Sequence, residues 1–206
     1  MPIKPMINAV RLMPDHLSLK REFICSIYAL LLGLIVGVVA KATDSISIIG
    51  EIGTLLGVWI FIATLIAAFS KSPFLAALNT LLFFLAVLAA YYSYTQLVFG
   101  FFPRSYFFGW FIIALLSPAG GSVVWFSRGK GWFAMTSAAL PIALLLAEGY
   151  PAYYTYQIAH VFDLCCAAVL LIVLPKIWKQ RMVVLMLSIV LTVIISRLNI
   201  YSLFPW

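Results

Sequence analysis

Acidic side chains within apolar segments are the residues best able to do chemistry in this sequence. Asp163 lies inside a long apolar run, and Glu51 and Glu148 lie near the ends of two others. A carboxylate at such a depth is costly unless it is paired, hydrated or protonated, which makes each one a candidate functional group. His160 precedes Asp163 by three residues, so both occupy one face of a helix. Together they could form a structural hydrogen bond, bind a ligand, relay a proton or contribute to a metal site.

Metal binding and catalysis have less support than a structural hydrogen bond or a ligand site. Two ligands spaced by three residues do not complete a zinc site, and no HExxH or CxxC motif supplies the rest. No nucleophile elbow or phosphate-binding loop is present. Cys165 and Cys166 could serve a membrane thiol enzyme with His160, although cysteine in apolar surroundings is usually a packing residue. We therefore expect no cofactor, no metal and no catalytic residue.

Aromatic residues gather near the same ends of the apolar segments as these acids. Tyrosines beside several carboxylates would form a cup for a small cationic or amine-bearing ligand, through ion pairing and cation–π contact. An aromatic belt at the membrane interface is the alternative explanation for most of them. Arg104 could pair with one acid or select an anion. The predicted ligand-binding residues are Glu51, Tyr91, Tyr92, Arg104, Glu148, Tyr153, Tyr154, His160 and Asp163.

Seven apolar segments must position these residues, and each is about long enough to cross a bilayer. A helix rising ~1.5 Å per residue needs roughly 20 residues to cross ~30 Å of hydrocarbon. Because the bilayer leaves backbone groups no water to bind, we expect an all-α, polytopic transmembrane helical bundle. Arg197 interrupts the last segment, so the chain has seven or six spans. The segments are Phe23–Ala40, Ser47–Phe69, Phe74–Val98, Tyr106–Phe126, Trp132–Ala147, Tyr156–Pro175 and Met182–Leu203.

Basic residues favour one side of these segments. Of the 13 lysines and arginines, ten lie in the N-terminal tail and in every second gap, and three lie elsewhere. This positive-inside bias predicts a cytoplasmic N-terminus and a multi-pass protein of the cell inner (plasma) membrane. Residues 1–21 are expected to form a cytoplasmic or interfacial tail, and residues 22–206 a single transmembrane domain. The net charge of +7 then indicates contact with anionic lipids of the bilayer rather than with nucleic acid.

Small residues form a stripe along the first segment. Ala29, Gly33 and Gly37 are spaced by four, so they lie on one face of a helix and allow another backbone to approach closely. That backbone could belong to this protein's own helices or to a transporter partner subunit.

Helix breakers fall at similar depths in the fourth and fifth segments. They predict kinks near the middle of the membrane, where freed backbone groups must be buried in protein or face a wet cavity. Such kinks could act as a gate. The residues are Pro118, Gly120, Gly121 and Pro141.

The small-residue stripe and the break at Ser117–Gly121, together with the size and the cytoplasmic start, resemble the substrate-binding S subunits of bacterial energy-coupling-factor vitamin transporters. The resemblance implies a compact helical bundle that binds a vitamin near the outer face. It also implies docking through the first helix onto a transmembrane coupling subunit. This chain has one predicted span more than those subunits, and no vitamin signature matches residue by residue.

The leading hypothesis is an integral membrane protein, not an enzyme, that binds a small solute from the outer side for uptake, alone or with a partner subunit. One alternative is a non-transporting assembly or regulatory subunit of a membrane complex, in which the stripe would matter most. A second alternative is a small membrane enzyme acting on a lipid or a peptide, which would depend on Cys166 and His160.

Overall fold

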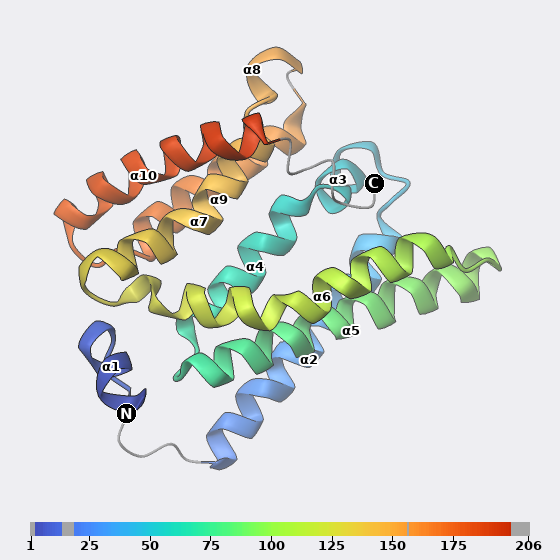
Figure 1. Ribbon diagram of the computed structural model, residues 1–206. Helices are drawn as coiled ribbons and strands as arrows, with labels where there is room; N and C mark the ends of the chain where they lie inside the picture. Colours follow the sequence, from blue (N-terminus) through green and yellow to red (C-terminus); the bar gives the residue numbers. More distant parts are fainter. Residues whose placement is uncertain (1–2, 14–18, 156, 199–206) are drawn as a thin grey trace.

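A computed structural model describes residues 3–13, 19–155 and 157–198, and every regular element in this part of the chain is a helix (Figure 1). The prediction of an all-α protein is confirmed. The elements are α1 Ile3–Val10, α2 Leu19–Ala42, α3 Ser47–Thr54, α4 Leu56–Phe69, α5 Pro73–Phe99, α6 Arg104–Trp125, the 3-10 turn η1 Phe126–Arg128, α7 Gly131–Gly149, α8 Ala152–Thr155, α9 Ile158–Val173 and α10 Trp178–Arg197.

Five of these helices are long and apolar enough to cross a membrane, namely α2, α5, α6, α7 and α10. The apolar helices α4 and α9 are shorter. The second predicted segment is divided at Leu55 into α3 and α4. Parts of the predicted tail and of the last two segments lie outside the described residues; they are residues 1–2, 14–18, 156 and 199–206.

The small-residue stripe packs against α5 of the same chain. A Cβ added at Gly37 would lie 2.6 Å from the Val87 carbonyl oxygen, and one added at Gly33 would meet the Phe83 carbonyl oxygen. Ala29 is also buried. Of the two interpretations of the stripe, the structure therefore shows close packing within the protein. The matching order of these contacts makes α2 and α5 parallel, as the predicted first and third segments should be.

Two further helix pairs follow the same alternation of direction. Thr80 of α5 lies beside Ser117 of α6, whereas Tyr92 lies beside Phe107, so these helices are antiparallel. On the far side of the bundle, the Ser188 hydroxyl of α10 donates to the Ala139 carbonyl of α7 at 3.4 Å. The Thr192 hydroxyl donates to the Ala143 carbonyl one turn later, which makes α7 and α10 parallel.

The N-terminal helix α1 packs on the end of the bundle that carries Lys20, Arg21, Lys71, Arg128 and Lys130, called here the basic end. Carbonyl groups at the ends of α4 and α6 lack partners within their own helices. The Arg11 guanidinium donates to both, to Ser70 at 3.3 Å and to Trp125, and it stacks 4.3 Å from the Trp125 ring centroid. Burial, with the nearby charge of Arg128, lowers the Arg11 pKa to about 10. Arg11 therefore ties α1 to two helix ends.

Pro118 and Pro141 lie inside α6 and α7, each of which remains a single helix through its proline. The kinks predicted there stay predictions. The discontinuity in the bundle is at Leu55, in a segment that contains no proline.

Two adjacent glycines of α6 provide a test of the packing. A Cβ at Gly121 would lie 2.9 Å from the Ala76 carbonyl oxygen and against the Thr80 hydroxyl, whereas a Cβ at Gly120 would have nothing within 4 Å. Gly121→Ala should lower the free energy of unfolding by about 1–3 kcal/mol through overpacking. Gly120→Ala should leave it unchanged or raise it by up to about 1 kcal/mol, because alanine is the better helix former. Thermal unfolding in detergent measures both, and equal losses would contradict the α5–α6 interface.

Candidate functional site

The break between α3 and α4 exposes backbone amides inside an apolar bundle. Leu55 has extended backbone angles (φ −74°, ψ 151°), and α4 starts directly after it without a side-chain cap from Leu55 itself. The first amides of a helix have no partner within that helix, and leaving them unpaired in a membrane costs several kcal/mol each. Some other element must therefore supply an acceptor.

Glu148, at the end of α7, supplies this acceptor. The Leu56 amide donates to Glu148 Oε1 at 2.6 Å, and the Gly57 amide also donates to this carboxylate. The side chain is buried, with 6% of its surface exposed. Glu148 thus caps α4 from another helix, and its carboxyl group lies at the positive end of the α4 dipole.

Asp163 of α9 approaches the same turn from another direction. A Cβ added at Gly57 would lie 2.5 Å from Asp163 Cγ, so the carboxyl group occupies the space that any larger residue at position 57 would need. Asp163 is 1% exposed and is an electrostatic neighbour of Glu148. We call Glu148 and Asp163 the acid pair. Glu148 Oε2 and Asp163 Oδ2 are both buried without a hydrogen-bond partner among the described residues.

Close packing of α7 and α9 explains how two acids reach one place. A Cβ at Gly149 would meet the Leu164 side chain at 2.8 Å and the His160 carbonyl oxygen at 3.0 Å, so the two backbones nearly touch beside the acid pair. Farther along, small α7 residues such as Ala138 and Ala139 pack with Leu170 of α9 in the main hydrophobic core.

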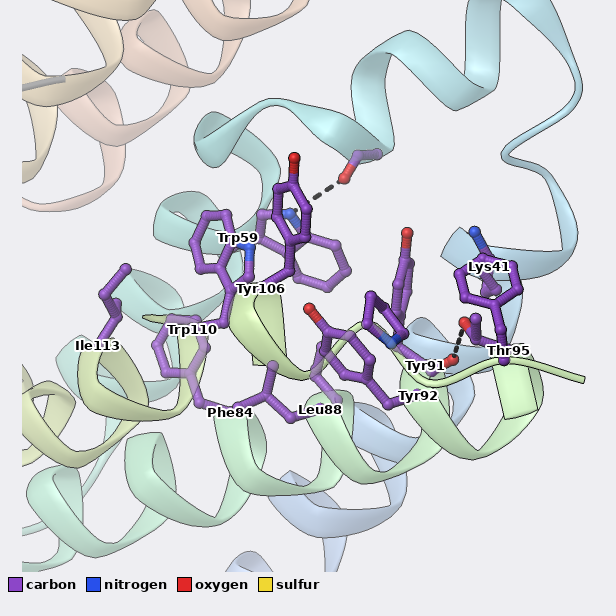
Figure 2. Close-up of a pocket in the computed structure, with 14 residues that line it drawn as sticks. Lys41, Trp59, Phe84, Leu88, Tyr91, Tyr92, Thr95, Tyr106, Trp110 and Ile113 are labelled. Atoms are coloured by element: carbon purple, nitrogen blue, oxygen red, sulfur yellow. Dashed lines mark hydrogen bonds between the residues drawn. The ribbon is translucent and has the colours of Figure 1, made fainter. Parts of the chain in front are cut away.

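A second feature is a cavity of about 430 Å³ between α4, α5 and α6, which we call the aromatic pocket (Figure 2). Figure 2 shows aromatic side chains from these three helices surrounding it, with Lys41 at one side. It lies toward the opposite end of α2, α5 and α6 from the basic end. The lining residues are Lys41, Gly53, Trp59, Phe84, Val87, Leu88, Tyr91, Tyr92, Thr95, Phe101, Pro103, Tyr106, Trp110 and Ile113.

Lys41 is the charged residue of this lining. Its ammonium lies 2.6 Å from Asp44 Oδ2, and 5.1 Å and 5.2 Å from the ring centroids of Tyr91 and Phe99. An ammonium has three donors; one bonds Asp44 and a second bonds the Tyr91 side chain, which leaves one for a ligand. The pocket therefore combines apolar, ring-lined walls with one cationic donor.

Trp59 connects the aromatic pocket to the α3–α4 break. Its indole Nε1 donates to the Gly53 carbonyl at 3.1 Å, which bridges from α4 back to α3 across Leu55 (Figure 2). Gly53 and Trp59 line the aromatic pocket, while Leu56 and Gly57 contact the acid pair. The first turn of α4 thus separates the two features and touches both.

The residues predicted to form one cup are distributed over several places. Tyr91 and Tyr92 line the aromatic pocket, and Glu148 and Asp163 form the acid pair. His160 is half-buried one turn before Asp163, and its Nδ1 has no partner among the described residues. The remaining predicted residues are exposed and lie outside the pocket lining; they are Glu51 on α3, Arg104 at the start of α6, and Tyr153 and Tyr154 on α8.

The sequence did not predict the α3–α4 break. It also did not predict that Lys41 and Trp59 line the aromatic pocket or that Gly57 contacts Asp163. From the sequence, Lys41 counts only toward topology, Trp59 does not stand out, and nothing marks Gly57 as the partner surface of Asp163. A signal was present, because Gly50, Gly53 and Gly57 occur within eight residues of an otherwise apolar segment.

A scan against protein-family models, a search of curated proteins and a search of solved structures each found no match for this chain. Geometry and chemistry are therefore the basis for a proposed function.

Two glycines on either side of Leu55 test the contact with Asp163. Gly57→Ala should lower the free energy of unfolding by about 1–3 kcal/mol, because the new methyl group displaces the carboxyl group. Gly53→Ala is the matched control, since its nearest contact would be an ordinary 3.8 Å to Ala40 Cβ. Thermal unfolding of both variants in detergent is the measurement. A Gly57→Ala protein as stable as Gly53→Ala would show that Asp163 does not occupy this position.

Proposed function

We propose that this integral membrane protein binds a small solute in the aromatic pocket for uptake across the membrane, alone or with a partner subunit. The observation that carries the proposal is the pocket itself. Its volume of about 430 Å³ falls in the range of small-molecule sites, about 300–1,000 Å³, and such sites are mostly apolar with a few polar groups.

The lining favours a planar, largely apolar solute with one anionic group. Rings of Tyr92, Tyr106 and Trp110 offer surfaces for a flat ligand, and Lys41 offers a charge-assisted hydrogen bond. The sequence alone favoured an amine-bearing solute because of the nearby acids. Since the acid pair lies outside the pocket lining, an anionic group opposite Lys41 fits the site better.

The side from which the solute enters follows from the basic residues. With the cytoplasmic N-terminus that the positive-inside bias predicts, the basic end lies inside and the aromatic pocket opens toward the outer half of the membrane. A broken helix beside a binding site is a recurring device of secondary transporters, where it provides a movable element near the substrate. The α3–α4 break borders the pocket through Gly53 and Trp59.

The assembly-subunit and enzyme hypotheses have less structural support. Gly33 and Gly37 are covered by α5, so the stripe offers no open face for another protein. Cys166 is buried, and His160 Nδ1 has no cysteine partner among the described residues. The resemblance to S subunits remains a proposal. A coupling subunit would then have to bind the face of α2 that carries the exposed residues Tyr28 and Ile35.

A pair of lysine variants tests the proposed ligand site. Native mass spectrometry of the protein, extracted gently from its own host, should detect a bound small molecule. Lys41→Gln should reduce the bound fraction as expected for an affinity loss of about tenfold or more, because a hydrogen bond to a charged group contributes about 1.5–3 kcal/mol. Lys71→Gln, at the basic end, should leave it unchanged. Absence of any small molecule, or equal occupancy in both variants, would contradict the proposal.

A further inference from the structure

The acid pair contains two carboxyl groups, and the backbone donors at the start of α4 serve one of them. The amides of Leu56 and Gly57 both go to Glu148. One oxygen of each acid, Glu148 Oε2 and Asp163 Oδ2, is buried and has no hydrogen-bond partner among the described residues. A buried polar atom without a partner costs about 1–3 kcal/mol, and more when it is charged, so both oxygens require a partner that the described residues do not provide.

The positive charge near the pair can offset at most one carboxylate. The amino end of α4 carries about half a positive charge. On α9 the nearest titratable residues are His160 and Cys166, while α3 contributes Glu51, which is exposed, and α10 contributes Arg197, which is also exposed at the same end. Neither acid forms an ion pair with a lysine or arginine in the described part of the chain. Two neighbouring carboxylates in an apolar interior do not both remain ionised.

A proton fits this site better than a metal ion. No group of three or more His, Cys, Asp and Glu side chains among the described residues could hold a metal. The amino end of α4 also repels a cation placed beside it, whereas a proton bound to Asp163 removes a negative charge and supplies a donor.

We propose that Glu148 and Asp163 form a proton-binding site that shares one proton, and that loss of this proton shifts the first turn of α4 and with it Trp59 in the wall of the aromatic pocket. Glu148 remains the ionised cap of α4, and Asp163 carries the proton. On release, the Asp163 O–H bond breaks, the electron pair stays on the carboxylate and the proton passes to water. His160 is half-buried and lies one turn nearer the exposed start of α9.

The mechanical link is short and consists of two contacts and two residues of one helix. Asp163 lies against Gly57, the Gly57 amide is held by Glu148, and Trp59 is two residues farther along the same helix. A new negative charge on Asp163 repels the Glu148 carboxylate and competes for the same amides. The role of this proton as the coupling ion for uptake rests on the proposed function; the proton site itself does not.

Infrared difference spectroscopy of the full chain in lipid nanodiscs tests the site without any ligand. A step from neutral to alkaline pH should remove a carbonyl-stretch band of a protonated carboxyl group. Asp163→Asn should lack this change. Glu51→Gln, which removes an exposed carboxyl group from α3, should retain it. Glu148→Gln keeps an acceptor for the Leu56 amide and removes the sharing partner, so it should alter the band even where Asp163→Asn fails to fold.

Tryptophan emission tests the link to the pocket. The contribution of Trp59, obtained by subtracting the emission of Trp59→Phe, should change over the same pH range as the infrared band, and this change should disappear in Asp163→Asn. A wild-type protein without the band, or with a band that persists in Asp163→Asn, overturns the proton site. A band without a matching Trp59 response overturns the link. If the wild-type protein shows the infrared band but native mass spectrometry detects no bound small molecule, only the proposed function is rejected.

Discussion

The amides freed at the start of α4 are the constraint on which the rest of this structure depends. A helix that stops and restarts inside an apolar bundle must find acceptors for those amides. Glu148 meets this need from α7, and its carboxylate is acceptable in such a place because the end of the α4 dipole offsets its charge. The close approach then requires glycine at position 57, and the space left by that glycine admits Asp163. The break in this helix thereby accounts for the position of the acid pair and for the glycine at position 57. Both acids come from α7 and α9, which pack closely beside it.

Helix α4 lies between two groups of helices, one with the aromatic pocket and the other with the acid pair. Figure 1 shows α2, α5 and α6 grouped on one side, and α7, α9 and α10 on the other, with α4 between them; α4 contacts members of both groups. The aromatic pocket belongs to the first group and the acid pair to the second. The first turn of α4 contacts the acid pair, and Trp59 in this turn lines the pocket and bridges to Gly53, so this turn is a direct connection between the two features. The proposed solute site and the proposed proton site thus share one helical turn, an arrangement that would suit ion-coupled uptake.

The sequence predicted the helical class and the approximate limits of the apolar segments, because length and hydropathy decide both. It also indicated that buried acids matter, and Glu148 and Asp163 do meet. It did not predict where they meet, since the partner surface is the backbone of residues 56 and 57, which carries no side-chain signal. The kinks at Pro118 and Pro141 stay predictions, whereas the discontinuity at Leu55, in a segment with several glycines, was not predicted. The aromatic residues were predicted as a group, but only contacts in three dimensions separate pocket-lining Tyr92 from exposed Tyr153.

Hydrogen exchange at the amides of Leu56 and Gly57 tests most directly whether Glu148 caps the broken helix. In the wild-type protein these two amides should exchange slowly, because each is buried and donates to the Glu148 carboxylate. Glu148→Ala should accelerate their exchange by a large factor while the amides of Phe83 and Val87, in the distant α2–α5 interface, keep their protection. Rapid exchange at residues 56 and 57 in the wild-type protein, or equal protection in Glu148→Ala, would contradict the account.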